Sequence, residues 1–457
     1  MRRRTTRRGD PVARLLASVR DGRSADVRVL ENHWTTIRFA AGRIHQPHVE
    51  RATIVSFRVA DDRRLGVATT TDVSPDGVDR LSRAAHRLAA VAPREPSFPG
   101  FPVGRGPARP VPWSASTAEV SSDVACRAAE RLISHALSAA PGAEVAGALH
   151  LGGQRIRVAN TSGLDREDRT SVAQASVLAE RPERDPPVSG WSEGASWDLR
   201  RLDLDAIGQE AGERMPTSAP TACPAGTYRV VLRGPAVAEA LAFLAHLGFA
   251  GGAEVDGSSC LRTWRGRRLG PASLTVTDDP RSPTTLPRAI DYEGKVTARF
   301  PLLTEGRVGP AAADLVAAGR LHRRPTGHAF PPEAPWGTIG GLPAHVVLRP
   351  GSASEEELVR ETRHGILVSR FHYVRTVDPG SGMITGMTRD GTYRIDGGEI
   401  VGPVRNLRFT ESVRTVLAGV EGIGRESRTY SGERGQVSQT VPSLAVRSFR
   451  FTSATVF

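Results

Sequence analysis

The first quarter of the chain alternates between apolar and polar positions in a way that predicts short strands followed by a helix. Residues 26–39 and 52–59 alternate with the period of two that is typical of half-buried strands. The predicted elements are, in order, a short amphipathic helix at 9–22, a strand at 26–39, a turn and third short strand at Gly42-Arg43-Ile44, a strand at 52–59, a polar hairpin tip at 61–64, a strand at 65–69 and a helix at 72–92. Together they predict an antiparallel sheet with helices on one face.

A proline-rich segment separates this part from a second group of helices and strands. It runs from Pro93 to Pro112 and holds seven prolines and three glycines, which predicts a linker or an extended crossing segment. After it the pattern predicts a helix at 120–139, strands at 145–151, 154–160, 171–180 and 191–198, and a helix at 204–215. We expect Gly152-Gly153 to form a type I′ hairpin turn, and residues 160–163 to form a second turn.

From Gly226 onward the pattern consists mainly of short strands separated by turns. A strand at 228–232 and a helix at 235–247 come first, and the helix is apolar enough to predict that it is buried. The turn sequences that follow include Asp378-Pro379-Gly380, Arg389-Asp390-Gly391 and Asp396-Gly397-Gly398. This spacing predicts a mostly-β domain, as a barrel or a layered sheet, with a helix at 354–363 on its flank.

The fold class expected from these patterns is α+β, with an N-terminal antiparallel sheet and helices, a middle α/β segment and a mostly-β C-terminal domain. At 457 residues the chain is long enough for two or three domains with ordinary cores. The expected division is a tail and short helix (1–24), an N-terminal α+β domain (25–93), a Pro/Gly-rich linker (94–112), a central α/β region (113–220) and a mostly-β C-terminal domain (221–457).

Composition indicates a soluble globular protein. Hydrophobic residues are 39% and charged residues 24% of the chain, and we find no stretch near the roughly 18 apolar residues that a membrane span needs. The N-terminus has arginines without the apolar region of a secretory signal, so we expect a cytoplasmic protein. The three cysteines, Cys126, Cys223 and Cys260, show no C-x-x-C spacing, which indicates neither a disulfide framework nor a zinc ribbon.

The formal net charge of +12 raises the question of nucleic-acid binding. Lys295 is the only lysine among the 61 basic residues, and the arginines are spread over the whole chain. This distribution indicates a coding bias rather than a phosphate-binding surface, so nucleic acid is not expected as a partner. The one dense run, Arg2 to Arg8, is expected to be a disordered tip.

A series of short turn and strand segments follows a fixed order through the second half of the chain. The segments are Val230 to Pro235, Asp256 to Ser259, Leu274 to Pro280, Asp291 to Gly294, Pro325 to His328, Gly351 to Leu358, Gly365 to Val368, Thr385-Gly386, Tyr393 to Gly398 with Pro403-Val404, and Gly432 to Gln436. In this order they resemble the TldD/PmbA family, also called the modulator of DNA gyrase family. The collinear run is specific, although each turn alone is common. The resemblance extends more loosely over the N-terminal third and is weakest between Pro93 and Pro220.

The resemblance implies a zinc chemistry whose residues are missing here. Active members of the family look like zinc peptidases with a helical H-E-x-x-x-H motif and a later cysteine as third ligand. None of the twelve histidines in this chain is followed by glutamate. On the matching helix Phe243, Leu244 and Gly248 stand where His, Glu and His are expected, and Ser431 stands at the cysteine position. The resemblance therefore implies no catalytic residue and no metal ligand in this chain.

Two residues of the same helix are the candidates to replace the missing ligands. Glu239 and His246 are the fallback ligand candidates, but seven residues of helix separate them by two turns, and His246 is expected to be a core or interface histidine. His328 and Arg389 lie in the family-like loops and are the candidates for substrate binding.

Three further pairs of ionisable residues are not expected to do chemistry. His322 and His328 flank a loop, and His364 and His372 bracket a strand. Asp291 and Glu293 would share one face if they lay on a strand, and a structural salt bridge with an arginine, or solvation at a turn, is expected for them rather than acid–base catalysis.

The family contains two kinds of subunit, one with the metal motif and one that lacks it and pairs with the first. This chain resembles the second, PmbA/TldE-type subunit. The resemblance implies a heterodimeric metallopeptidase in which this chain, inactive alone, contributes to the binding of small or unfolded peptides. Zinc is then expected in the TldD-like partner and no cofactor in this chain.

Three alternatives remain open at this point. The chain could be a stand-alone hydrolase with non-standard ligands. It could be a homo-oligomeric peptide-binding protein without catalysis. The older name of the family also suggests an association with DNA or a topoisomerase.

Overall fold

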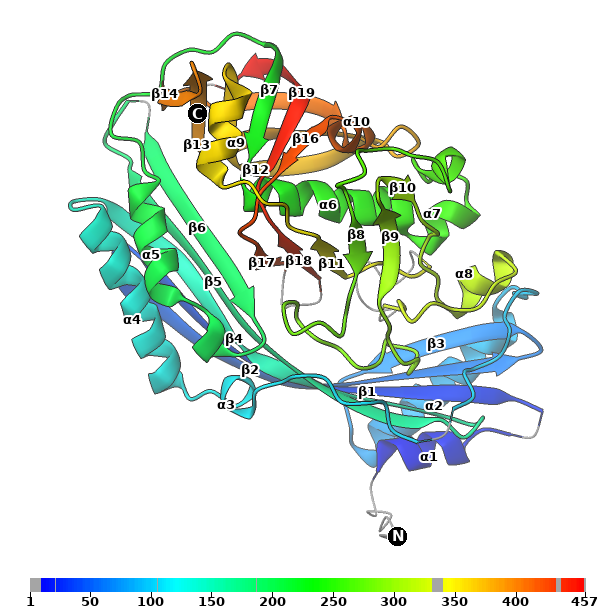
Figure 1. Cartoon of the computed structure of the whole chain (residues 1–457). Helices are drawn as coiled ribbons and strands as arrows, with labels where there is room; N and C mark the ends of the chain where they lie inside the picture. Colours follow the sequence, from blue (N-terminus) through cyan, green and yellow to red (C-terminus); the bar gives the residue numbers. More distant parts are fainter. Residues whose placement is uncertain are drawn as a thin grey trace.

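The structure is a computed structural model that describes residues 10–20, 22–104, 106–185, 187–330, 340–432 and 437–455. The predicted tip at Arg2 to Arg8 and the family-like residues Glu433 to Gln436 lie outside the described residues. The N-terminal half forms a long curved sheet, and the C-terminal half sits against the inner face of that sheet (Figure 1).

One six-stranded antiparallel sheet holds all the strands of the N-terminal half, in the order β3-β2-β1-β4-β5-β6. Its strands are β1 (Ser24–Ala40), β2 (Arg43–Asp61), β3 (Arg64–Thr70), β4 (Glu144–Asn160), β5 (Asp165–Arg181) and β6 (Val188–Ser196). Strand β1 pairs with β2 on one side and with β4 on the other. The strands before and after the proline-rich segment therefore belong to one sheet, although the local pattern places them in two separate groups.

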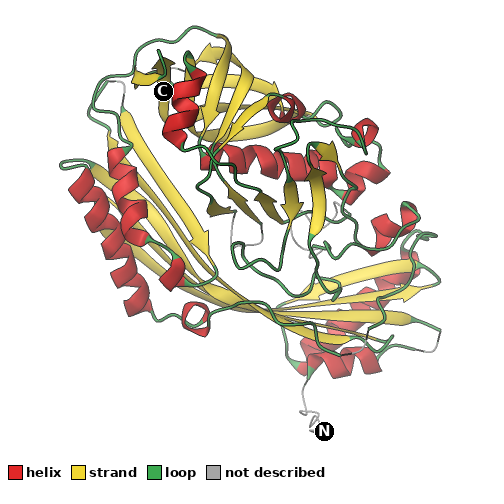
Figure 2. Cartoon of the chain, viewed as in Figure 1, coloured by secondary structure: helices red, strands yellow, loops and turns green. Residues whose placement is uncertain are grey.

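Helices cover the outer face of this sheet (Figure 2). They are α1 (Pro11–Ala17), α2 (Pro75–Val91), α3 (Ala115–Ala118), α4 (Ser122–Ala139) and α5 (Leu204–Glu213), with a 3-10 turn at Leu199–Arg201. The alternation along β1 explains this arrangement, because Val27 and Ile37 pack among the helices, whereas Leu30 packs with Tyr292 of the C-terminal half. The predicted sheet with helices on one face is confirmed.

Two predicted interruptions of the strands were wrong. The two strands expected between residues 43 and 59 form the single strand β2, and Gly152-Gly153 lies inside β4 rather than in a hairpin turn. A Cβ atom on Gly152 would lie 2.1 Å from the carbonyl oxygen of His33, and one on Gly153 would lie 2.6 Å from the Cβ of Ala118. The two glycines therefore permit the close approach of β1 and α3.

The proline-rich segment packs between the sheet and the C-terminal half. Phe98 and Phe101 are buried in a cluster with Leu315, and the side chain of Asn160 donates a hydrogen bond to the carbonyl oxygen of Pro102 at 2.8 Å. These anchors make it an extended crossing segment, one of the two forms expected.

In the C-terminal half, helix α6 (Gly234–Phe249) lies between a barrel and a second sheet (Figure 1). The barrel consists of β12 (Gly365–Asp378), β7 (Gly226–Leu232), β19 (Leu444–Ala454), β15 (Leu407–Ser412) and β13 (Met383–Asp396), with β14 (Glu399–Pro403) and β16 (Val420–Ile423) attached. It closes because β12 also pairs with β13. The helix predicted to be buried is thus enclosed on two sides.

The second sheet has the order β10-β9-β8-β11-β18-β17. Its strands are β8 (Val276–Asp278), β9 (Phe300–Thr304), β10 (Arg307–Val308), β11 (His345–Leu348), β17 (Arg428–Ser431) and β18 (Ser438–Val441). The remaining helices are α7 (Gly251–Val255), α8 (Leu315–Arg320), α9 (Glu355–Thr362), α10 (Val413–Ala418) and a 3-10 turn at Arg262–Trp264. Among the described helices we find none that is long and apolar enough to cross a membrane.

One predicted turn of this half lies inside a strand. Arg389-Asp390-Gly391 belongs to β13, where Asp390 has φ 54° and Gly391 has φ 118°. The register with β12 shifts opposite this point, so the sequence marks a bulge rather than a chain reversal. The turns at Asp378 to Gly380 and at Asp396 to Gly398 do connect strands, as predicted.

Candidate functional site

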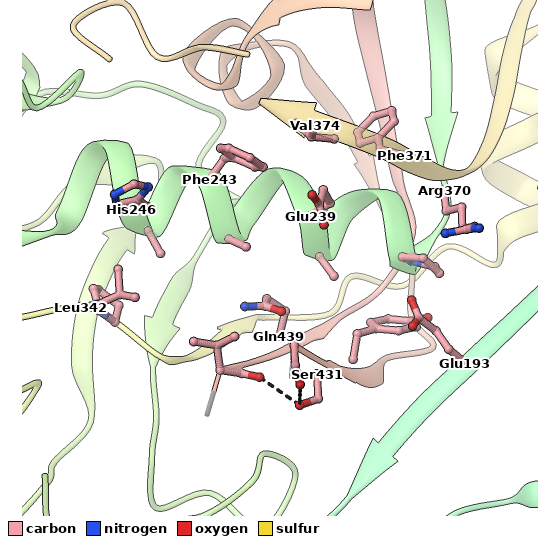
Figure 3. A pocket seen from close by; sticks show the side chains of 18 of the residues that line it. Glu193, Glu239, Phe243, His246, Leu342, Arg370, Phe371, Val374, Ser431 and Gln439 are labelled. Atoms are coloured by element: carbon pink, nitrogen blue, oxygen red, sulfur yellow. Dashed lines mark hydrogen bonds between the residues drawn. The ribbon is translucent and has the colours of Figure 1, made fainter. Parts of the chain in front are cut away.

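A cavity of about 460 Å³ opens beside α6, where the two halves of the chain meet. Its walls come from α6, β12, the β17–β18 pair and β6. Figure 3 shows Phe243, Glu239 and His246 along α6, Arg370, Phe371 and Val374 from β12, and Glu193, Ser431 and Gln439 on the opposite side.

Helix α6 supplies the two ionisable residues that the sequence had suggested as fallback ligands. The helix starts with Pro235 in its first turn and is otherwise rich in alanine and leucine, which have high helix propensity. Glu239 and His246 are its only ionisable residues, and both line the cavity. A charged group on a helix packed between two layers is unfavourable without a partner, so Glu239 stands out.

A second carboxylate reaches the cavity from β6. Burial raises the pKa of Glu193 to about 7; Arg370 opposes this rise and Glu239 adds to it. Burial also raises the pKa of Glu239, against the opposing charges of Arg370 and Arg375. Two acids with raised pKa values therefore face one space, from elements that are far apart in the sequence.

His246 lies along α6 from Glu239, toward the other end of the cavity (Figure 3). Seven residues of helix separate the two by about 10 Å of rise, which is too far for one ion. Burial lowers the pKa of His246, which favours its neutral form. Within the described residues we find no group of three His, Cys, Asp or Glu side chains that could hold a metal ion.

The positions that the family resemblance assigned to the zinc site are only partly brought together. Phe243 and Ser431 line the same cavity. Leu244 is instead part of the buried core, and a Cβ on Gly248 would meet Leu261 at 2.8 Å. The Ser431 hydroxyl lies 2.9 Å from the carbonyl oxygen of Gly432 and 3.1 Å from that of Val437, and its single proton is shared between these two acceptors. A phenyl ring and an engaged hydroxyl do not fit a zinc ion.

The two residues predicted to bind substrate lie away from this cavity. His328 is only 5% exposed, and its ring nitrogens contact Thr326 Oγ1 at 2.8 Å and Asp278 Oδ2 at 3.1 Å. Arg389 lies on β13 with its guanidinium 3.8 Å from Asp390. A role for either residue in substrate binding stays a prediction.

The other ionisable pairs occupy structural positions. Asp291 and Glu293 lie in a tight turn rather than on a strand, and the N–H of Gly294 donates to the carbonyl of Asp291 at 3.1 Å. Both acids are buried, and Glu293 forms the expected salt bridge, with Arg58 at 2.9 Å. His364 lies just before β12 and contacts Asp396 at 2.6 Å, whereas His372, which was expected to follow a strand, lies within β12.

The cavity leads into a wider polar groove on the inner face of the long sheet. This groove encloses about 1000 Å³ and shares Arg370, Ser431 and Gly432 with the cavity. Polar side chains of β1, β2, β4 and β5 line it, among them Thr36, His48, His150 and Gln174. The Gln174 amide donates to the carbonyl of Ser431 at 2.9 Å, which joins the floor of the groove to β17.

Sequence reasoning missed Glu193, Arg370 and Gln439. Arg370 follows a run of apolar residues in β12 and is therefore a charged residue entering a barrel wall, which is a usable signal. Glu193 and Gln439 carry no such local signal, because only the packing of β6 and β18 around α6 brings them to the cavity.

We expect Glu193→Gln to raise the free energy of unfolding at pH 8 by about 1–3 kcal/mol and at pH 5 by less than about 1 kcal/mol. The folded-state pKa of about 7 lies above the ordinary value of 4.5. The unfolded chain therefore ionises first, and the wild-type protein loses stability as pH rises from about 4.5 through 7. Urea unfolding of both proteins at each pH measures the difference.

The exposed Glu399, on β14, provides the control for this prediction. Glu399→Gln should change the free energy of unfolding little at either pH. An equal gain from Glu193→Gln at pH 5 and pH 8 would show that Glu193 does not titrate in the range argued here.

Family models match almost the whole chain. The model of the PmbA/TldA metallopeptidase C-terminal domain matches residues 225–453, that of domain 1 matches residues 25–92, and that of the central domain matches residues 111–217.

Two curated relatives are metalloproteases of archaea. The protein of Methanothermobacter thermautotrophicus is 28% identical over 255 residues, and that of Methanocaldococcus jannaschii is 25% identical over 233 residues. The matches span about half of this chain and half of each relative, 53% and 48% respectively.

Solved structures share the whole fold. TldE from Thermococcus kodakarensis has a TM-score of 0.84 at 18% identity, over 96% of this chain and 98% of that one. A protein of Thermotoga maritima described as a candidate modulator of a DNA gyrase has a TM-score of 0.83 at 20% identity, over 96% and 99%. At these identities the likeness establishes the fold.

Proposed function

Because the chain belongs to the PmbA/TldD metallopeptidase family, we propose that it is the metal-free subunit of a two-subunit peptidase. In this proposal a family member with the zinc motif binds zinc and performs the hydrolysis. The present chain contributes to the binding of small or unfolded peptides. The similarity of its fold to TldE supports this assignment.

The observation that carries the proposal is the replacement of the zinc site. Phe243 and Ser431 line the cavity at two of the positions where the family pattern has ligands, while Leu244 and Gly248 are buried away from it. A metallopeptidase needs nitrogen, sulfur or carboxylate ligands and an open position that activates water. The side chains at these four positions offer no such set.

The surfaces beside the cavity suit an extended peptide. Strand β17 is the edge strand of the second sheet and ends at Ser431, at the rim of the cavity and of the groove. An extended peptide can bind a sheet edge by main-chain hydrogen bonds while its side chains enter neighbouring pockets. The polar groove gives such a peptide a path across the inner face of the long sheet.

The test is the cleavage of an unfolded peptide by this chain, by a motif-bearing family member of the same genome, and by their mixture. We expect the chain alone to be free of stoichiometric zinc and inactive. The mixture should form a complex on size exclusion and cleave the peptide, with zinc bound to the partner. Metal content by mass spectrometry and the cleavage rate are the two readouts.

Two outcomes would overturn the proposal. Zinc-dependent cleavage by the chain alone would identify a stand-alone hydrolase with ligands outside the family pattern. A partner that cleaves equally well without this chain, and that does not bind it, would show that the two proteins do not act together.

A further inference from the structure

We propose that the cavity beside α6 binds an ammonium group of a peptide, held by the carboxylates of Glu193 and Glu239 and by the side-chain amide of Gln439. This inference rests on the proposed function, because it names the class of peptide that such a subunit accepts. It assigns a positive ligand to the cavity that two positions of the family's metal pattern, Phe243 and Ser431, line.

Gln439 is the first observation that points to a ligand. It is 6% exposed and lines the cavity, and in Figure 3 its amide lies below α6, between Glu239 and Ser431. Within the described part of the chain we find no hydrogen bond made by this amide. The amide is not among the fully buried polar atoms that lack a partner, so it is open to the cavity that it lines. A ligand with a donor or acceptor at this point can form a hydrogen bond with it.

The two carboxylates provide the second observation. Among the described residues neither Glu193 nor Glu239 forms a salt bridge. Burial is the main cause of both raised pKa values, and Glu239 adds to the rise at Glu193. A cation placed between the two carboxylates adds an attraction to each of them, and it favours the ionised form of both acids.

The arginines of the cavity do not supply this cation. The Nε of Arg370 donates to Asp390 at 2.5 Å, and its guanidinium stacks on the Trp191 ring at 4.2 Å. Arg375 is exposed and donates to the carbonyl oxygen of Val374 at 3.1 Å. The charges of both arginines lower the pKa of Glu239, but among the described residues neither arginine forms an ion pair with Glu193 or Glu239. An ammonium group of a ligand can supply that direct contact.

The remaining walls favour an organic cation over a metal ion. Phe243, Phe371, Val374 and Leu342 form an apolar surface next to the acids, which suits the side chain or alkyl stem that carries an ammonium group. The cavity joins the polar groove, so the rest of a peptide can continue along the inner face of the sheet.

The ammonium can be the amino terminus of a peptide or a lysine side chain, and three probes distinguish them. The probes are alanine-rich hexapeptide amides that carry a fluorophore at the C-terminal end. One has a free amino terminus, one is N-acetylated, and one is N-acetylated with an internal lysine. Binding to the full chain is measured by fluorescence anisotropy. We expect the acetylated neutral peptide to bind at least about tenfold more weakly than the better of the two cationic peptides, as the loss of a charge-assisted hydrogen bond implies.

Variants then test whether the difference in affinity between cationic and neutral peptides arises in the cavity. Glu239→Gln keeps the shape of the side chain and should weaken the cationic peptide about tenfold while leaving the acetylated neutral peptide unchanged. Gln439→Leu should weaken the cationic peptide as well. Glu399→Gln, which changes an exposed acid on β14, should leave binding unchanged. Thermal unfolding of each variant verifies that it is folded.

Equal binding of all three peptides, binding unaffected by Glu239→Gln, or no binding of any peptide overturns the inference. The proposed function has a separate readout, because the mixture with the motif-bearing partner can still cleave peptides in each of these cases. Suppose that the Glu239→Gln chain supports cleavage of cationic and neutral peptides in the wild-type ratio. This result would refute the ammonium site without contradicting the proposed two-subunit peptidase.

Discussion

Replacing Arg58 by alanine is expected to lower the free energy of unfolding by about 3–5 kcal/mol, because it leaves two buried carboxylates without their cation. Arg58, on β2, donates to Asp26 at 2.7 Å and to Glu293 at 2.9 Å, and its side chain is only 17% exposed. Burial opposes its charge, but the two acids together raise the pKa of Arg58. Its guanidinium also lies 5.0 Å from the centre of the Phe101 ring.

This contact joins three parts of the chain. Asp26 belongs to the long sheet, Phe101 to the proline-rich segment, and Glu293 to the C-terminal half, where it also accepts a hydrogen bond from the N–H of Leu315 at 3.0 Å. Loss of the guanidinium should therefore weaken the docking of the two halves as well as local packing. Chemical denaturation followed by far-UV circular dichroism measures the loss, and limited proteolysis in the proline-rich segment reports on the docking.

The loss should depend on pH with a definite sign. Burial raises the pKa of Glu293 to about 8, while Arg58 opposes this and Asp314 and Asp291 add to it. Without Arg58 the folded-state pKa rises further above the ordinary value, so stability falls as pH increases from about 4.5 upward. The variant should consequently lose more at pH 8 than at pH 5.

An exposed ion pair gives the matched control. Arg14 pairs with Asp79 at 2.6 Å, with side chains 49% and 39% exposed, and Arg14→Ala should lower the free energy of unfolding by less than about 1 kcal/mol. If Arg58→Ala costs no more than this control, the buried contact does not hold the two halves together.

Local patterns in the sequence were sufficient for elements whose environment is uniform along their length. The alternation of β1 follows directly from having helices on one face and the C-terminal half on the other. The amphipathic pattern of residues 72–92 became α2, with Val78, Leu81 and Ala85 buried. The continuous apolar run of α6 reflects its position between a barrel and a sheet. In each case the burial of a residue is set by its place in a repeating element.

Local patterns failed where the strand pairing or backbone conformation of a residue depends on contacts with a distant part of the chain. The pairing of β1 with β4 joins strands that are more than a hundred residues apart, and neither strand carries a signal for its partner. Asp390-Gly391 has the composition of a turn, but its backbone forms a bulge whose aspartate binds Arg370 of the neighbouring strand. Turn-forming residues show only that the backbone adopts an unusual conformation, and tertiary contacts determine whether that conformation forms a chain reversal or a bulge.

The candidate site shows the same limit. The residues of α6 could be placed in advance because they share one helix, and the absence of the zinc motif could be read directly from the sequence. Glu193 and Gln439 come to the cavity from β6 and from β18, through the packing of one half of the chain on the other. The sequence therefore shows directly that the zinc ligands are missing, but it does not show which residues from distant strands line the cavity in their place.

Gly152→Ala is expected to lower the free energy of unfolding by about 2–5 kcal/mol, because it adds a collision to an unfavourable backbone conformation. Gly152 has φ 151° and lies in the middle of the long sheet, opposite Trp34 of β1 and Val172 of β5. Its added Cβ would meet backbone of β1, which cannot move without disturbing the ladder, in addition to the Trp34 ring at 2.7 Å. Urea denaturation compares the variant with wild type.

The substitution of Gly163 is the control that separates the cost of a collision between strands from the cost of a positive φ alone, which is what the hairpin turn suggested by the sequence would give. Gly163 lies in the turn between β4 and β5 with φ 87°, and we find no described heavy atom within 4 Å of its added Cβ. Gly163→Ala should lower the free energy of unfolding by only about 1–2 kcal/mol, the backbone penalty alone. Similar losses at both positions would mean that Gly152 acts only through its backbone angle. A clearly larger loss at Gly152 would establish close approach of two strands as its role, and Trp34→Ala would not relieve it, because the main obstacle is the carbonyl oxygen of His33.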